Sequence, residues 1–170
     1  MVLTKCMFAV QTFHLEVKTT QGTDILDLTR LVQDKVRESG ISDGVLTLFI
    51  AGSTAALTTI EYESGVINDL RAAIERLFPQ DLVYEHDRRW GDGNGYSHVR
   101  AAFLKPSLSI PIEKGNVVLG TWQQIVLLDF DNRPPSPQHP GPGHGDQAID
   151  RMKSALIPST IYDIRPKYIS

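Results

Sequence analysis

The chain has 170 residues, of which 41% are hydrophobic, and a net charge of -3 at pH 7 with a pI near 5.9. That length suits one well-buried domain, since domains commonly contain ~100 to 200 residues. The acidic balance disfavours general attraction to nucleic acid or an anionic membrane, although Arg88 and Arg89 form a local basic pair. No apolar run approaches the ~20 residues of a membrane helix. We therefore expect neither nucleic acid nor a membrane as a partner.

The cysteine content bears on the compartment. Cys6 is the only cysteine and cannot form an internal disulfide. Residues 1–18 contain no apolar run of signal-peptide length. These two features predict a cytoplasmic protein.

The first predicted elements are a strand and a helix. Apolar and polar residues alternate from Met7 to Lys18, which predicts a half-buried strand with His14 on its solvent face. From Asp24 to Ser39 the apolar residues recur at helical spacing, which predicts an amphipathic helix. Thr23 or Asp24 can cap its start, and Gly40 can end it.

The middle of the chain predicts one more helix and several strands. Val45 to Ala51 is rich in β-branched and aromatic residues, as strands are. Helical spacing runs from Ser64 to Phe78, where Pro79 ends it. Glu113 to Asn116 reads as a glycine-containing hairpin turn. Short strands are predicted at Val99 to Leu104, Ser107 to Ile112, Asn116 to Leu119 and Ile125 to Phe130.

This order predicts an α+β fold, a mostly antiparallel β-sheet or sandwich with two main helices. The predicted domain covers residues 1–133. Prolines and glycines crowd residues 134–146, which predicts an extended connector, and a C-terminal tail follows at 147–170 with a short helix over Gln147 to Leu156. His139 and His144 lie in the connector, where nothing would hold two metal ligands rigidly.

Polar side chains gather between Tyr84 and Gln124. His86 and His98 are imidazole donors, and the residues between them that offer oxygen donors are Asp87, Asp92 and Asn94. A divalent cation such as Zn²⁺ or Mg²⁺ takes such a mixed nitrogen and oxygen set. The alternative is a polar surface loop whose histidines hydrogen-bond to neighbours, because the spacing matches neither H-E-x-x-H nor C-x-x-C.

The glycines around Asp92 also suggest a phosphate-binding loop. A phosphate-binding loop of the known types leads into a helix, whereas the residues from Tyr96 to Leu104 look like a strand. The oxygen donors do not follow the twelve-residue calcium-loop pattern either. A metal site therefore remains the better functional interpretation of this segment.

Three further groups of residues suit binding or catalysis. Ser53 and Thr54 can donate hydroxyls to a ligand, or simply cap a turn, since no general base is identifiable beside them. Glu61 offers an acid/base or metal-ligand group, or a carboxylate near a helix start. Trp122 and Gln123 can hold a flat heterocycle by stacking and amide hydrogen bonds, or lie in the core and at the surface.

Several short motifs resemble the YjbQ-like family, whose members are often described as secondary thiamine-phosphate synthases. The similarity extends over roughly His14 to Arg133, with motifs in the family's order and spacing. The motifs are Gly52-Ser53-Thr54-Ala55-Ala56-Leu57, Thr59-Ile60-Glu61-Tyr62-Glu63, Tyr84-Glu85-His86, Asp92-Gly93-Asn94-Gly95, Ser97-His98-Val99-Arg100, Pro106-Ser107 and Leu119-Gly120-Thr121-Trp122-Gln123-Gln124.

The resemblance implies a homotrimeric α+β protein with a site between subunits, where histidines hold a metal. It also implies the joining of an aminopyrimidine diphosphate to a thiazole phosphate with release of pyrophosphate. On this basis His86 and His98 bind the metal, and Glu61, Asp92 and Asn94 complete or orient its shell as the catalytic set. Ser53 and Thr54 then contact the phosphate of a phosphorylated small molecule, and Trp122 and Gln123 shape the heterocycle pocket.

Two departures from the family pattern limit this transfer. Many relatives have a histidine where this chain has Gly52, so one candidate ligand is absent. The proline- and glycine-rich stretch stands where basic residues and a final strand are expected after Asp129-Phe130-Asp131. The alternative function is a trimeric metal- or ligand-binding protein with no physiological catalytic role. The residues alone identify neither the physiological substrate nor the metal, nor any role of His139 and His144.

Overall fold

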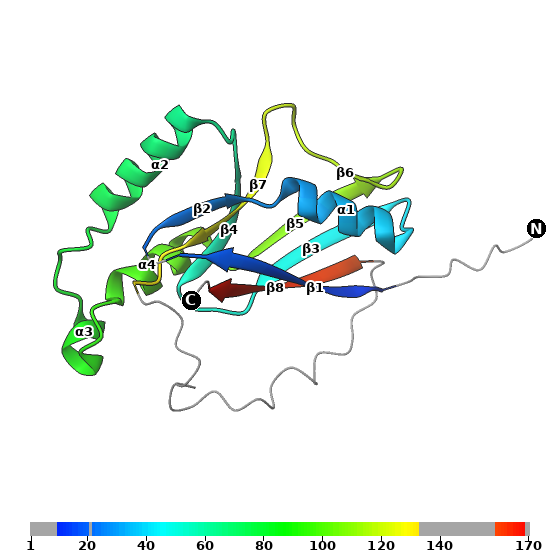
Figure 1. Ribbon diagram of the computed structural model, residues 1–170. Helices are drawn as coiled ribbons and strands as arrows, with labels where there is room; N and C mark the ends of the chain where they lie inside the picture. Colours follow the sequence, from blue (N-terminus) through cyan, green and yellow to red (C-terminus); the bar gives the residue numbers. More distant parts are fainter. Residues whose placement is uncertain (1–9, 21, 133–158, 169–170) are drawn as a thin grey trace, which may run out of the picture.

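The chain folds into two β-sheets with helices at their margins (Figure 1). This computed structural model describes residues 10–20 and 22–132, and the backbone of residues 159–168. In chain order the elements are β1 (Thr12–Thr19), β2 (Asp24–Asp27), α1 (Thr29–Ser39), β3 (Gly44–Ile50), β4 (Ala55–Ile60), α2 (Ser64–Leu77), α3 (Glu85–Trp90), α4 (Gly95–Leu104), β5 (Ser107–Glu113), β6 (Asn116–Val117), β7 (Gln124–Asp129) and β8 (Ser159–Tyr168).

The larger sheet has the strand order β1-β8-β3-β5-β6, and the smaller has the order β2-β7-β4. β8 is parallel to both of its neighbours, β1 and β3. The other pairs among the described strands are antiparallel. The predicted α+β fold with a largely antiparallel sheet is therefore confirmed.

Strand β7 is buried on both faces and separates two apolar cores. Ile125 and Leu127 point into the core between the two sheets, which also contains Val32 and Val36 of α1. Phe130 and the β7 residues Val126 and Leu128 point the other way, into a second core with Ala101 of α4 and Ile74 of α2. Side chains alternate between the faces of a strand, so this continuous apolar run supplies both cores.

The helices divide between the two ends of the molecule. In Figure 1, α2, α3 and α4 gather at one end, and α1 lies near the β5–β6 hairpin at the other. α2 buries only Ile74 among its residues, whereas α4 buries five of its residues and packs on β4. α4 thus packs one face into the second core and presents other side chains at the surface.

Segment Val99 to Leu104, predicted as a strand, is instead part of α4. The prediction was wrong because a short apolar run between a glycine and a proline fits either structure. Tyr96, Arg100 and Ala101 share a helical face and are buried against the smaller sheet. Packing on that sheet therefore stabilises the helix.

The helix predicted from Asp24 to Ser39 is also shorter than expected. Asp24–Asp27 forms β2, which pairs with β7, and α1 starts only at Thr29. The Asp27 carboxylate accepts hydrogen bonds from the Thr29 amide at 2.8 Å and from its hydroxyl at 2.5 Å. Pairing with β7 thus overrides the helical spacing at the start of this segment, and neither Thr23 nor Asp24 caps α1.

Several other predicted elements match the structure. The strand ending near Lys18 is β1, with His14 exposed, and Gly40 ends α1. The strand from Val45, the helix from Ser64 and the hairpin at Glu113 are also present. The strand β4 had no counterpart among the predicted elements.

The C-terminal region is described only in part. β8 lies within the segment 147–170 and inserts between β1 and β3. The predicted connector at 134–146 and the predicted helix over Gln147 to Leu156 lie outside the described residues.

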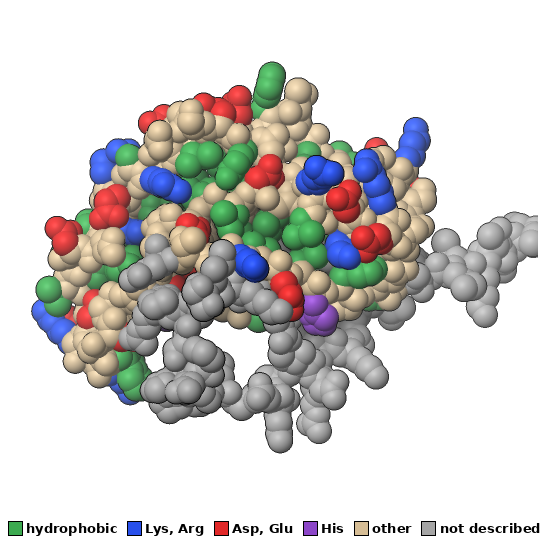
Figure 2. Space-filling view, in the orientation of Figure 1, with side chains coloured by type: hydrophobic (Ala, Val, Ile, Leu, Met, Phe, Trp, Pro, Cys, Tyr) green, Lys and Arg blue, Asp and Glu red, His purple; other side chains and the backbone are tan. Residues whose placement is uncertain are grey.

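None of the helices in the described part of the chain is long and apolar enough to span a bilayer. On the face shown in Figure 2, acidic and basic side chains are interspersed among apolar ones rather than gathered by sign.

Candidate metal centre

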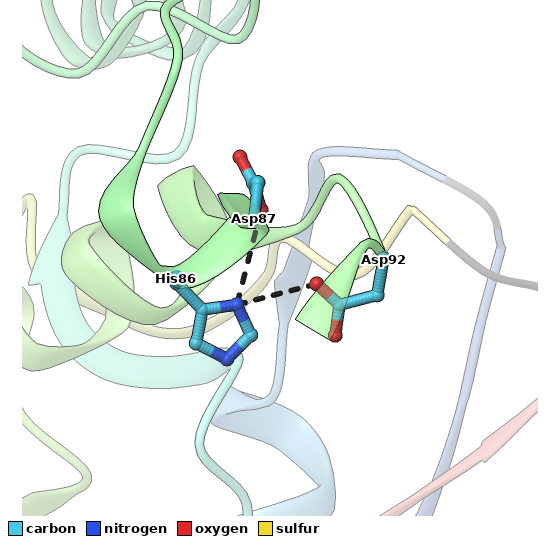
Figure 3. Close-up of side chains that lie close together, drawn as sticks. All are labelled: His86, Asp87 and Asp92. Carbon is cyan, nitrogen blue, oxygen red and sulfur yellow. Dashed lines mark ion pairs between the residues drawn. The ribbon is translucent and has the colours of Figure 1, made fainter. Parts of the chain in front are cut away.

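Two helices and the glycine-rich loop between them bring the candidate ligands together. His86 and Asp87 lie on α3, which ends at Gly91. Asp92 lies in the loop that leads to the first residue of α4, Gly95. Figure 3 shows the His86 imidazole pointing toward the carboxylates of Asp87 and Asp92.

The three side chains form a compact set of nitrogen and oxygen donors. Nδ1 of His86 lies 3.2 Å from Oδ1 of Asp92 and 3.8 Å from Oδ1 of Asp87. One donor atom from each residue lies within 4.8 Å of the others. Nδ1 is shielded from solvent, yet it forms no hydrogen bond with any described residue. Since a buried polar atom normally has a partner, a bound cation would satisfy this nitrogen.

Asp87 has a second task at the start of α4. Its Oδ1 accepts a hydrogen bond from the Gly95 amide at 2.8 Å, which places a carboxylate at the positive end of the helix dipole. A Cβ at Gly95 would lie only 2.5 Å from Cβ of Tyr84 and 3.0 Å from Oδ1 of Asp87. The close approach of α3 and α4 therefore requires glycine at this position. A helix does follow the glycine loop, but Asp87 occupies the amide that a phosphate would use.

Asn94 faces the Asp92 carboxylate from the start of α4. Asn94 is 7% exposed. With its amide nitrogen turned toward Asp92, it donates to Oδ1 at 3.2 Å and to Oδ2 at 3.1 Å. With the oxygen turned there instead, the two residues would present a cluster of oxygens that only a cation could stabilise. Either orientation makes Asn94 a residue that orients Asp92 or completes its donor set.

His98 lies beside this set rather than within it. Its ring centroid is 4.4 Å from that of His86, with the planes inclined by 43°. Its Nδ1 is 3.2 Å from the carbonyl oxygen of Ser53, which fits an Nδ1–H donor. In that tautomer Nε2 keeps its lone pair, as in histidines that bind metals through one nitrogen and are oriented through the other.

An open groove adjoins His98. Its volume is about 250 Å³. Small or apolar residues make up most of its lining, which consists of Gly52, Ser53, Ala55, His98, Ala101, Ala102 and Pro106. The histidine and the serine are therefore its polar side chains among the described residues, and no lysine or arginine of that part of the chain lines it. By volume it is smaller than the ~300 to 1,000 Å³ common for small-molecule sites.

Three of the predicted site residues lie at the other end of the smaller sheet: Glu61, Trp122 and Gln123. Ala55 pairs with Asp129 at the groove end of the β4–β7 ladder, and Ile60 pairs with Gln124 at the far end. At ~3.4 Å per residue these ends are about 17 Å apart. Glu61 directly follows Ile60 at this far end, and Trp122 and Gln123 directly precede Gln124. One subunit therefore does not bring these three residues to the histidines.

The far loop is nevertheless ordered by specific contacts. Oε1 of Gln123 accepts from the Gly120 amide at 2.8 Å, and its Nε2 lies 3.4 Å from the Thr59 hydroxyl. These bonds hold the turn from which Trp122 projects, with 68% of Trp122 exposed. Trp122 is thus a surface residue here, and Gln123 holds the loop.

The sequence identified His86, Asp92, Asn94, His98 and Ser53 as site residues, and the structure places them near one another. Asp87 belongs to the same polar segment of the sequence, but the sequence predicted no role for it in the site. Its position directly after His86 in the sequence was the signal available for such a role. Both residues lie on α3, a helix that the pattern of strands and loops did not predict. Thr54 lies at the groove end, where its carbonyl oxygen accepts from the Phe130 amide at 3.0 Å.

The fold and this cluster define a class: a small α+β protein of two sheets with a histidine–carboxylate centre beside an open groove. The model of the family called "UPF0047 protein YjbQ-like" matches residues 13–138. The chain belongs to this family, and the resemblance found in its motifs is confirmed.

Individual members of this family are similar to the chain in sequence and in structure. A UPF0047 protein of Methanothermobacter thermautotrophicus is 34% identical over 122 residues, covering 72% of this chain and 84% of that protein. One of Archaeoglobus fulgidus is 36% identical over 118 residues, 69% and 90% of the two chains. The crystal structure of a YbjQ-like protein of unknown function from Sulfolobus solfataricus P2 matches with a TM-score of 0.64 and 33% identity, over 68% of this chain and 82% of that one.

Proposed function

We propose that this protein is a metal-assisted transferase that joins an aminopyrimidine diphosphate to a thiazole phosphate and releases pyrophosphate. The metal centre is supported by one observation, the convergence of His86, Asp87 and Asp92 around a buried ring nitrogen without a hydrogen bond. The choice of reaction is supported by the family resemblance of the surrounding motifs.

The donor set fits a divalent cation. Imidazole nitrogen favours Zn²⁺, and carboxylate oxygens favour Mg²⁺ or Mn²⁺, so the mixed set allows either kind. His86, Asp87 and Asp92 would hold the ion, with Asn94 orienting Asp92 and His98 adjacent. A bound cation would supply neutralisation of the negative charge on the leaving diphosphate.

The protein's own groups serve binding and orientation. Nδ1 of His98 is engaged by the Ser53 carbonyl, so Nε2 is available as a ligand or proton acceptor. The Ser53 hydroxyl, in the groove, and Thr54 beside it are the proposed phosphate contacts. The apolar lining of the groove suits the uncharged part of a ring.

A complete pocket requires more surface than one subunit offers, which supports the proposed homotrimer. The groove is small, and Trp122 with Gln123 and Glu61 lies at the opposite end of the ladder. A head-to-tail contact between copies would bring one copy's Trp122 loop toward the next copy's His98 groove, and a threefold rotation between copies would close such contacts into a three-membered ring. Glu61 would then act from the neighbouring subunit.

One observation favours a second candidate, a trimeric metal- or ligand-binding protein without a catalytic role. Within residues 10–20 and 22–132, no lysine or arginine lines the groove beside His98. Two phosphorylated substrates would therefore depend on the metal centre for charge neutralisation. A protein that only binds a cation and a small ligand needs no such group.

Turnover separates the two candidates. Purified protein is supplied with both substrates and Mg²⁺ or Zn²⁺, and pyrophosphate and thiamine phosphate are measured. We expect slow product formation that EDTA and Asp92→Asn abolish, whereas His14→Ala on the exposed face of β1 retains it. Metal binding without product above a heat-killed control would replace the transferase by the binding protein.

A further inference from the structure

Asn132 connects the end of β7 to the loop that carries Asp92. Its side-chain Nδ2 donates to the Gly93 carbonyl oxygen at 2.9 Å and lies 3.5 Å from that of Asp92. Gly93 has a positive φ of 64°, which lets its carbonyl turn toward β7. A side chain that follows the central strand of the smaller sheet thus contacts the candidate metal loop directly.

Phe130, two residues before Asn132, contacts two other parts of the candidate metal centre, the Ser53 loop and the start of α4. Its amide donates to the Thr54 carbonyl at 3.0 Å. Its carbonyl accepts from the Ser97 hydroxyl at 2.6 Å. The short segment from Phe130 to Asn132 therefore holds the Ser53 loop, the start of α4 with His98, and the Asp92 loop in one arrangement.

Asp92 is the candidate ligand whose position depends most on such contacts. His86 and Asp87 lie on α3, and the Gly95 amide fixes the Asp87 carboxylate. Asp92 instead lies between Gly91 and Gly93, in a loop that contains three glycines in five residues. Glycine-rich backbone loses the most conformational entropy when it is ordered. A hydrogen bond that selects one loop conformation therefore lowers the cost of presenting Asp92 to a cation.

We propose that Asn132 is a positioning residue of the metal centre, which raises cation affinity by holding the Asp92–Gly93 loop. The inference rests on the proposed metal centre and adds a residue that neither the motifs nor the donor set identifies. Asn132 does not bind the ion. It acts through the Gly93 carbonyl, as outer-shell partners of metal ligands do.

The test compares variants that remove the donor. Asn132→Ala deletes the amide, and Asn132→Leu replaces it with an apolar side chain of similar size. Asn116→Ala is the matched control, because Asn116 also donates to a backbone carbonyl, that of Lys114 at 3.0 Å, on the distant β5–β6 hairpin. Calorimetric titration of the full-length proteins with Zn²⁺ and Mn²⁺ measures the affinities.

We expect both Asn132 variants to bind the ions ~10- to 100-fold more weakly, as for lost outer-shell contacts, and Asn116→Ala to bind like wild type. Co²⁺ absorption spectra should also change in the Asn132 variants, because a displaced Asp92 alters the ligand field. In an Asp92→Asn background, Asn132→Ala should cause little further loss, since the two residues act as a unit.

The outcomes separate this inference from the proposed function. If wild-type protein binds neither ion, the metal centre itself is wrong. If wild type binds and the folded Asn132 variants bind equally well, the positioning role is overturned. If neither variant folds, Asn132 is a general structural residue, and that result also overturns a role confined to the loop.

Discussion

The Nδ1 atom of His86 lies 3.2 Å from Oδ1 of Asp92, close enough for an electrostatic contact, yet the two groups form no hydrogen bond. The Asp92 carboxylate thus lies beside the His86 ring but accepts no hydrogen bond from its Nδ1. Asp87 approaches the same nitrogen at 3.8 Å. This geometry places the nitrogen and the two carboxylates within reach of one cation.

The first prediction orders the two histidines by their effect on metal binding. His86→Ala should weaken divalent-cation binding by more than the ~10- to 100-fold of an outer-shell change, because it deletes a candidate ligand. His98→Ala should weaken it less, since His98 lies outside the compact set. Elemental analysis and titration of both variants check this, with His14→Ala as control. Equal stoichiometry and affinity in wild type and His86→Ala would rule out the ligand assignment.

The second prediction concerns the contact between α3 and α4. Gly95→Ala should destabilise the protein by about 1–3 kcal/mol, as overpacking does, because its Cβ would contact Tyr84 at 2.5 Å and Asp87 at 3.0 Å. Gly52→Ala is the control, since its Cβ would have nothing within 4 Å. Urea unfolding compares the two variants. Equal midpoints would show that α3 shifts without strain.

The third prediction concerns Arg100, whose side chain is 2% exposed. Its Nε and Nη2 donate to the Phe78 carbonyl at 3.0 and 2.7 Å, and Nη2 also donates to Glu75 at 2.6 Å. Lysine cannot reproduce this planar fork. Arg100→Lys should therefore cost roughly 1–3 kcal/mol, the penalty for a buried group left without its bond. Arg71→Lys, at an exposed position of α2, should cost little in the same denaturation experiment.

The fourth prediction is a pH dependence of stability from Asp129. Burial raises the pKa of this carboxyl, and the nearby Asp131 and Asp24 raise it further, against lowering contacts from the Thr19 hydroxyl and the Asp131 amide. The folded protein therefore holds this proton to higher pH than the unfolded chain does. The stabilisation from protonated Asp129 is fully present below the pKa that this group has in the unfolded chain. It is lost as the pH rises through the higher pKa of the folded state.

The free energy of unfolding of Asp129→Asn should therefore vary less between pH 4 and 8 than that of wild type. Relative to wild type, the variant should become more stable toward neutral pH. Asp43→Asn provides the contrast. Hydrogen bonds from Ser42 and from the Lys114 amide lower the Asp43 pKa, so its stabilisation is present at neutral pH and lost on acidification. Urea unfolding across this range measures the Asp129 profile. The Asp43 profile must be followed to lower pH, because its pKa is lowered from an ordinary value of 3.8. A wild-type profile matching that of Asp129→Asn would contradict the assignment.

The fifth prediction concerns assembly. Light scattering should report a homotrimer at micromolar concentration, and Trp122→Ala should shift it toward monomer, because Trp122 is a large exposed aromatic on an ordered loop. Trp90→Ala, 59% exposed on α3, is the matched aromatic control. A monomeric wild type would refute the trimer. A trimer unaffected by Trp122→Ala would remove this loop from the interface.

The sequence by itself determined the strands whose side chains alternate or form a continuous apolar run, such as β1 and β7, and the helix α2. These patterns reflect local geometry, since a strand repeats every two residues and a helix every 3.6. It also located His86, Asp92 and His98 in one polar segment, because the motifs that contain them are local.

Only the tertiary structure decided which segments pack together. Burial against the smaller sheet makes Gly95–Leu104 a helix, and pairing with β7 makes Asp24–Asp27 a strand, although short apolar stretches are compatible with both. The six-residue ladder of β4 and β7 separates Trp122 from His98, a distance that no sequence motif encodes. The Asn132 contact arises because the end of β7 meets the glycine loop 39 residues away in the chain, through long-range packing that local residue patterns do not specify. The Asp87 contact spans only eight residues, but it depends on the close approach of α3 and α4.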